Sequence, residues 1–220
     1  MSDAAPHTPP TPIDWSTLRR WIDDTREVDD RTYRAARRTS RPVPWWRAPC
    51  PDLRRPVFIV GAPRSGTTFL GGACAALPEL SYHYEPPLTK AAARYVVEGR
   101  WSERRLRRLY RATYGWLLRR HGDAGLRFAE KTPQNCFTVD FLAHAFPGAR
   151  FVHIVRDGRD AALSHRAEGW LSAASAVSGR RESGGYPLGP TARFWVEPER
   201  RREFETTSDL HRCIWAWRRH

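Results

Sequence analysis

The sequence lacks several features that would mark other classes of protein. Its four cysteines stand far apart, at positions 50, 74, 136 and 213, and form no CxxC pair. This spacing argues against a zinc site and against a disulfide framework, so we expect reduced cysteines and no metal. The N-terminus has no apolar segment of the signal-peptide type, and no apolar run approaches the ~20 residues needed to span a bilayer. We therefore expect a cytoplasmic protein without a membrane span.

Acidic residues are also scarce relative to basic ones. Lys and Arg total 37 against 24 Asp and Glu, which gives a formal net charge of +13. Such an excess favours a polyanionic partner, an acidic ligand or a membrane surface, although an arginine-rich proteome would produce it too. With 220 residues, 40% of them hydrophobic, the chain is long enough for one substantial globular core.

The pattern of apolar residues predicts two parts. Residues 1–50 are expected to hold a proline-rich disordered tail and a helical extension that Asp14 caps, and residues 51–220 a nucleotide-binding domain. Within the domain the pattern predicts strands at 57–60, 128–129 and 151–155, helices at 67–76, 87–97, 102–120, 137–146, from 160 onward and at 208–220, and a flexible loop or lid at 178–190. This alternation predicts a three-layer α/β/α fold with a central parallel sheet, whose ligands bind beyond the carboxyl ends of the strands.

The stretch GAPRSGTT, residues 61–68, follows the first predicted strand and resembles a phosphate-binding loop. Gly61 and Gly66 permit backbone conformations that would turn successive N–H groups into one concavity, at the N-terminus of a helix beginning near Thr67. The lysine of a nucleotide triphosphatase loop is missing, because Thr67 follows Gly66, and Arg64 supplies the positive charge instead. The loop therefore suits a phosphate but weakens the case for an outer phosphate with magnesium.

A second phosphate site is predicted in FVHIVRDGRDAALSH, residues 151–165. Arg156 ends the second clear strand, and Ser164 lies in the helix that follows. A guanidinium and a hydroxyl above a strand end can bind a separate phosphate. The alternative is a structural ion pair between Arg156 and Asp160.

These motifs resemble those of sulfotransferases that use 3′-phosphoadenosine 5′-phosphosulfate (PAPS). Pro63–Thr68 matches the loop that binds the 5′-phosphosulfate in that family, and Arg156 with Ser164 matches the arginine and serine that bind the 3′-phosphate. The resemblance implies PAPS as sulfuryl donor and no required metal. It assigns donor binding to Arg64, Ser65, Gly66, Thr67, Thr68, Arg156 and Ser164.

A third stretch, FAEKTPQNCF at 128–137, refines the resemblance. Its E-K-T-P segment is similar to that of heparan-type sulfotransferases, and Glu85 lies 21 residues after Arg64, near the position of the catalytic glutamate in the carbohydrate and tyrosylprotein branches. The phenol and hormone branch has a histidine where Pro133 stands here. The resemblance implies Glu85 as general base, with Arg64 and Lys131 neutralising charge on the sulfuryl group. His83 is a rival base that we expect to point elsewhere.

Several questions stay open at this stage. The acceptor is an unidentified hydroxyl of a sugar, lipid, polyol or tyrosine. Family members usually continue past a position like His220, so we expect the domain to be incomplete at its C-terminus. Glu130 is expected to pair with an arginine, and the basic run at 104–111 to be one solvated face of a helix.

Two rival functions remain beside sulfuryl transfer. A P-loop nucleotide kinase or triphosphatase would bind ATP with magnesium, but the missing lysine argues against it. A non-enzymatic nucleic-acid-binding module is supported only by the net charge and the basic helix at 102–120, so we expect no nucleic-acid partner.

Overall fold

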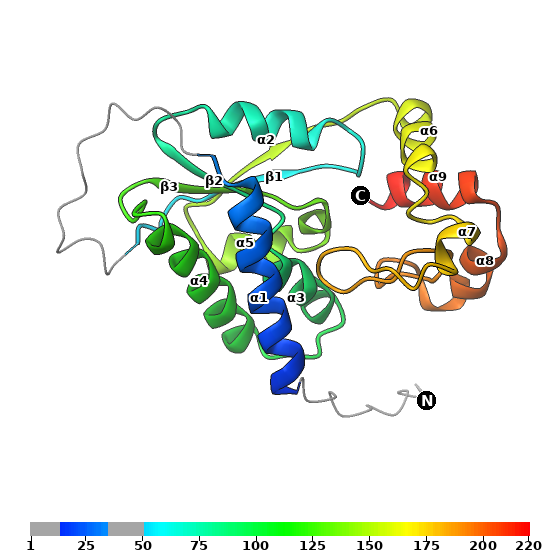
Figure 1. The fold of residues 1–220 in the computed structure, drawn as a ribbon, viewed down its shortest axis with the longest axis horizontal. Helices are drawn as coiled ribbons and strands as arrows, with labels where there is room; N and C mark the ends of the chain where they lie inside the picture. Colours follow the sequence, from blue (N-terminus) through cyan, green and yellow to red (C-terminus); the bar gives the residue numbers. More distant parts are fainter. Residues whose placement is uncertain (1–13, 35–50) are drawn as a thin grey trace, which may run out of the picture.

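The computed structural model describes residues 14–34 and 51–220. The proline-rich tail expected near the N-terminus lies outside these residues, as do residues 35–50. Figure 1 shows how the elements are arranged. In chain order they are α1 (Trp15–Thr32), β1 (Val57–Val60), α2 (Thr67–Ala75), β2 (Leu80–Tyr84), α3 (Pro87–Val97), α4 (Glu103–Arg120), β3 (Arg127–Lys131), η1 (Pro133–Phe137), α5 (Val139–Ala145), β4 (Arg150–His153), α6 (Gly158–Glu168), α7 (Ala173–Ala176), η2 (Pro198–Arg200), α8 (Arg201–Thr206) and α9 (Asp209–Arg219).

The four strands form one parallel sheet in the order β2-β3-β1-β4. All four residues of β1 are buried, as expected for a short apolar run in the middle of a parallel sheet. Side chains of β1 alternate between two cores. Val57 and Ile59 pack on the side of α2, whereas Phe58 and Val60 join the larger core beneath α1, α3, α4 and α5. The predicted three-layer α/β/α fold with a central parallel sheet is confirmed.

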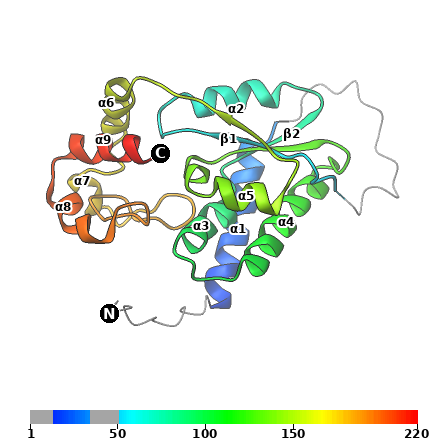
Figure 2. The same cartoon turned by 180° about the vertical axis from the view of Figure 1, so that it is seen from behind.

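Helices α6 to α9 lie together beyond the carboxyl ends of the strands, and Figure 2 shows the same arrangement from behind. They have a core of their own, built around Trp195, Phe204 and Trp215. Helix α6 packs along α9 so closely that a Cβ added at Gly158 would lie 2.7 Å from the Trp217 ring. A larger residue at this position would therefore force the Trp217 ring to move.

Several predicted elements differ in extent. Strand β4 ends at His153, because its partner β1 ends at Val60. Helix α6 begins at Gly158, since Asp157 caps it by accepting from the backbone N–H of Arg159. The predicted helix at 137–146 is split between η1 and α5, and β2, α7, η2 and α8 were not predicted.

Other expectations concern the surface and the thiols. The basic run Arg104–Arg111 lies on the exposed face of α4, with Leu106 and Tyr110 of the same helix buried, so the predicted solvated face is confirmed. Free thiols are found at Cys74, Cys136 and Cys213. Among the described residues, no helix has the length and apolar character needed to cross a bilayer.

Candidate active site

The loop between β1 and α2 is a tight turn that depends on its glycines. Gly61 has a φ of +154°, and a Cβ there would lie 2.5 Å from the carbonyl oxygen of Ile154 on the neighbouring chain segment. Gly66 has a φ of +95° and forms the N-cap of α2. Arg64 has a φ of +68°, a strained conformation for a residue with a side chain. Strain of this kind gathers at functional sites, where the surrounding fold maintains it.

Polar groups of this loop are suited to an anion. Ser65 is buried, and its Oγ has no hydrogen-bond partner among the described residues. Thr67 is buried in the first turn of α2, while Thr68 beside it is exposed. The positive end of α2 and the unpartnered hydroxyl of Ser65 thus lie in the same turn of chain, and a helix N-terminus with hydroxyl donors beside it can bind phosphate.

The structure brings the two predicted phosphate sites into contact. The Nε atom of Arg64 donates to Ser164 Oγ at 3.1 Å, and its guanidinium pairs with Glu168 at 2.9 Å. Arg156 donates to the backbone carbonyl of Arg64 at 3.2 Å. Arg156 also lies 3.8 Å from Asp160, but both side chains are largely exposed, so this pair contributes little. Loop and helix α6 thus form one continuous polar surface.

Glu85 lies where β2 ends, in contact with two lysines. Its backbone N–H donates to the carbonyl of Lys131 at 3.0 Å, since Tyr84 and Lys131 are in register across β2 and β3. One carboxylate oxygen accepts from Lys90 at 2.6 Å, and the other accepts from Lys131. All three side chains are at least nine-tenths buried. The sequence analysis named Glu85 and Lys131 as site residues, and the structure adds that they are in contact. Lys90 was not predicted.

The two lysines determine the charge of Glu85. Burial alone would raise the pKa of this carboxyl group, but the ammonium groups of Lys90 and Lys131 outweigh burial and lower the pKa to about 2. Glu85 is therefore ionised at neutral pH. Glu85 also has a φ of +38°, a second strained residue beside the loop. The signal for Lys90 was present in the sequence, as a lysine among apolar residues on α3, five positions after the glutamate.

A cleft of about 660 Å³ lies between the carboxyl ends of the strands and the C-terminal helices. Pro63, Glu85 and Lys90 line one side. The opposite side includes the segment 178–190, whose Glu182 lies 3.5 Å from Lys90 and pairs with Arg193 at 2.8 Å. This segment covers the cleft as a lid would, while its flexibility stays a prediction.

Comparison with known proteins agrees with this geometry. The model of a sulfotransferase family matches residues 56–195, which include the loop, Glu85, Lys131 and the Arg156–Ser164 segment. This chain belongs to the sulfotransferase family. The expected family is thereby confirmed, while its assignment to the carbohydrate and tyrosylprotein branches stays a prediction.

A curated relative gives a second, more distant likeness. Protein-tyrosine sulfotransferase A of Caenorhabditis elegans is 28% identical over 116 residues, which cover 47% of this chain. The matched region spans 30% of the length of that relative. The likeness supports a sulfotransferase core and leaves the acceptor open.

His83 is not placed to act as a base at this cleft. It is buried, with its two ring nitrogens bonded to Asp29 at 2.7 Å and to Ser81 at 3.0 Å. Burial lowers the pKa of His83, although Asp29 opposes this effect. The side chain points away from the cleft, as the sequence predicted.

The prediction that Glu130 pairs with an arginine was wrong. Glu130 is fully buried under the sheet and accepts from Tyr114 at 2.5 Å, from Asn135 at 2.7 Å and from Thr132 at 3.2 Å. All three donors are neutral, and no arginine within residues 14–34 and 51–220 pairs with Glu130. Burial therefore dominates and raises the pKa of Glu130 to about 7.

Glu130→Gln is expected to stabilise the sulfotransferase at alkaline pH. The folded state keeps the Glu130 proton between the ordinary pKa of 4.5 and about 7, so stability falls as pH rises through this window. Glutamine does not titrate, so the variant avoids this loss, and its side chain can still form hydrogen bonds. We expect its free energy of unfolding to exceed that of the parent protein by about 3 kcal/mol above pH 7. Urea unfolding at acidic and alkaline pH would measure the difference, with the exposed Glu199→Gln as control. A Glu130→Gln effect that does not change with pH would contradict it.

Proposed function

We propose that this chain transfers a sulfuryl group from PAPS to an acceptor hydroxyl. The observation that carries the proposal is the buried contact between Glu85 and Lys131, beside a cleft that Pro63 of the loop also lines. A base, a cation and an anion-binding loop at one cleft are the groups that sulfuryl transfer needs.

The loop would hold the 5′ end of the donor. The Ser65 hydroxyl and the N-terminus of α2 supply donors for an anion, and Gly66 keeps the entrance free of a side chain. Arg64, Thr67 and Thr68 would add charge and hydroxyl donors around the same group. Because no lysine follows Gly66, this donor set suits a single phosphate better than a triphosphate.

Arg156 and Ser164 would hold the 3′-phosphate. Both contact Arg64, one through its backbone and the other through its side chain, so the two phosphate sites share one residue. Guanidinium groups bind phosphate oxygens with strong charge-assisted hydrogen bonds. A ligand with phosphates at both ends would therefore bind this surface better than one with a single phosphate.

Glu85 would accept the proton of the acceptor hydroxyl while the hydroxyl oxygen attacks sulfur. The bond from sulfur to the donor phosphate breaks, which yields a sulfate ester and adenosine 3′,5′-bisphosphate. A carboxylate held by two ammonium groups is a weak base. If Lys131 turns towards the sulfuryl oxygens, Glu85 keeps only Lys90 and becomes more basic as charge develops on the donor.

The acceptor would enter the 660 Å³ cleft. The name of the relative makes a tyrosine peptide the first acceptor to test, and the membership of this chain in the carbohydrate and tyrosylprotein branches is part of the proposal. Trp170, Tyr186 and Trp195 give the cleft aromatic walls, which suit a phenol ring or the flat face of a sugar. Lipids and polyols complete the panel of acceptors.

Adenosine 3′,5′-bisphosphate is expected to stabilise the fold without added metal. At about 100 times its dissociation constant, a ligand that binds only the folded state adds roughly 2.7 kcal/mol. Thermal unfolding with the bisphosphate, compared with ATP and magnesium, measures this. A shift with ATP and magnesium alone would favour the nucleotide kinase instead.

Arg156→Ala provides the matched variant for this measurement. It is expected to weaken ligands with a 3′-phosphate by about 10–100-fold and ligands without it much less, since one charge-assisted partner is lost. Arg159→Ala is the control, because Arg159 is exposed and pairs only with Asp157 next to it. Equal weakening of both ligand types by Arg156→Ala would place the 3′-phosphate site elsewhere.

A further inference from the structure

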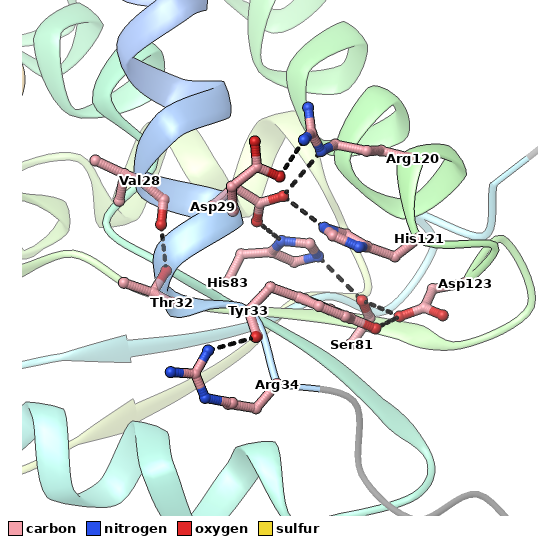
Figure 3. Close-up of polar contacts among 11 residues, drawn as sticks. Val28, Asp29, Thr32, Tyr33, Arg34, Ser81, His83, Arg120, His121 and Asp123 are labelled. Atoms are coloured by element: carbon pink, nitrogen blue, oxygen red, sulfur yellow. Dashed lines mark hydrogen bonds and ion pairs between the residues drawn. The ribbon is translucent and has the colours of Figure 1, made fainter.

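A cluster of two histidines and an aspartate lies outside the cleft. Asp29 of α1 is held between His83 of β2 and His121, which follows α4, with Oδ1 2.7 Å from His83 Nδ1 and Oδ2 2.6 Å from His121 Nε2. Figure 3 shows the three side chains converging from separate elements. His83 and Asp29 are buried and His121 is nearly so. The proposed sulfuryl transfer uses none of these residues.

The hydrogen bonds around His83 determine where its protons lie. Ser81 and Tyr33 both donate to the carboxylate of Asp123, so the single hydroxyl proton of Ser81 is already used. Ser81 Oγ must then accept from His83 Nε2, 3.0 Å away. A neutral imidazole carries one N–H. With that proton on Nε2, the lone pair of Nδ1 faces the carboxylate of Asp29.

Two lone pairs at 2.7 Å repel each other unless a positive charge lies between them. That charge is either a second proton on His83 or a metal ion. A second proton would make a buried imidazolium that pairs with the Asp29 carboxylate. A metal ion instead uses the lone pairs of both histidines and of the carboxylate.

We propose that a divalent transition-metal ion, zinc above all, binds at Asp29, His83 and His121. Their ligand atoms lie within 4.8 Å of one another. Two imidazoles and a carboxylate are donors that zinc prefers, whereas magnesium and calcium prefer oxygen ligands alone. The argument against zinc from the sequence concerned cysteine pairs, and this site contains no cysteine.

The shell around the site supports this assignment. Ligating histidines usually donate their other N–H to an oxygen, most often of a carboxylate, a backbone carbonyl or water. His83 has such an oxygen in Ser81 Oγ, which itself donates to Asp123. The ring of His121 stacks on Tyr33 with centroids 3.5 Å apart, which fixes its orientation. Ligand atoms of a tetrahedral zinc site lie about 3.3 Å apart, so the three ligand atoms, which lie within 4.8 Å of one another, would adjust their spacing around the ion.

The local charge also permits a cation. Arg120 lies 3.6 Å from Asp29 and would oppose a metal ion, but it pairs with Asp30 as well. Asp29 and Asp30 both bring a carboxylate to the guanidinium of Arg120. A cation at Asp29 would therefore be attracted by two carboxylates as well as repelled by Arg120.

Such an ion would join three elements that are distant in sequence. It would fasten α1 to β2 and to the end of α4, and it would hold the strand whose next residues lead to Glu85. The metal would thus be structural, and its binding does not depend on the proposed activity.

The experiment uses the full chain after removal of metal with a chelator. Zinc chloride is expected to raise the midpoint of thermal unfolding until one equivalent has been added, and magnesium chloride is not. Cobalt chloride, as a spectroscopic probe, is expected to give the strong visible absorption of a four-coordinate site. No shift with zinc and no such absorption with cobalt in the parent protein would overturn the proposal.

Variants identify the ligands. His121→Gln is expected to abolish the shift of the unfolding midpoint with zinc. Ser81→Ala is expected to lower the affinity for zinc about 10–100-fold, because Ser81 orients His83. His144→Gln is the control, because His144 is exposed on α5 and bonds only to a backbone carbonyl. A zinc shift as large in His121→Gln as in the parent would place the metal elsewhere. Nitrogen NMR that finds both ring nitrogens of His83 protonated, with no zinc bound, would assign a proton to the site and would also overturn the proposal.

Discussion

Glu85→Gln is expected to lower sulfuryl transfer by about 10²–10⁴-fold, because glutamine keeps the size of the side chain but cannot accept a proton. The measurement is the rate at which adenosine 3′,5′-bisphosphate forms from PAPS with each acceptor of the panel. Binding of the bisphosphate should persist, since Glu85 contacts lysines and not the loop that would hold the phosphates.

The two buried lysines beside Glu85 could destabilise this variant, and a second substitution separates that effect from the loss of the base. Glutamine would leave the buried ammonium group of Lys131 without a carboxylate and Lys90 with only Glu182, 3.5 Å away. Breaking a buried pair in this way costs roughly 3–5 kcal/mol. Lys90→Met in the same chain removes one of these charges. The double variant is therefore expected to regain stability but not transfer.

Glu79→Gln serves as the control, because Glu79 is exposed at the start of β2. It should behave as the parent protein in transfer and in stability. A Glu85→Gln/Lys90→Met variant that is folded, binds the bisphosphate and transfers at the parental rate would show that Glu85 is not the base.

Lys131→Met is expected to lower the rate of sulfuryl transfer by about 10²–10³-fold, the second large effect that we predict. Methionine matches the lysine in length, so the packing over the Tyr84 ring, 4.1 Å from the ammonium group, is largely kept. Glu85 keeps Lys90 and stays ionised, but the cation proposed for the sulfuryl oxygens is gone. The bisphosphate should still bind, because it carries no sulfuryl group.

A pH profile and the other lysine separate this role from a structural one. Without Lys131 the pKa of Glu85 rises from about 2, so the acidic limb of the rate profile moves to higher pH. Lys90→Met removes the same kind of contact from Glu85 but leaves Lys131 for the donor, and its loss of transfer should be smaller. Equal losses in the two variants would mean that both lysines serve only Glu85.

Local signals in the sequence were enough for much of the fold. The run Val57–Val60 followed by Gly61 predicted the central strand and its loop, because a short apolar run that ends in glycine has few other interpretations. Strand β2 was harder to predict. Its residues LSYHY are partly polar, and they form a strand because the polar atoms of Ser81 and His83 find partners on α1 and after α4.

Only part of the candidate site could be predicted from the sequence. The roles of Glu85 and Lys131 came from the resemblance of their motifs to a family, and the structure adds that they touch. Lys90 and the contact between Arg64 and Ser164 were not predicted, because they depend on how α3 and α6 pack. The cluster at Asp29 joins residues 54 and 92 positions apart, and no local pattern carries such information.

The close packing of Gly158 against Trp217 has a consequence for the order of events during synthesis. The turn that carries Arg156 leaves the ribosome early, but the helix that supports it follows only after α7 and α8. Domains generally acquire structure from the N-terminal end as the chain emerges. The parallel sheet and the first phosphate loop are therefore expected to mature first, and the nascent chain to become able to retain a bisphosphate only once residue 217 has emerged.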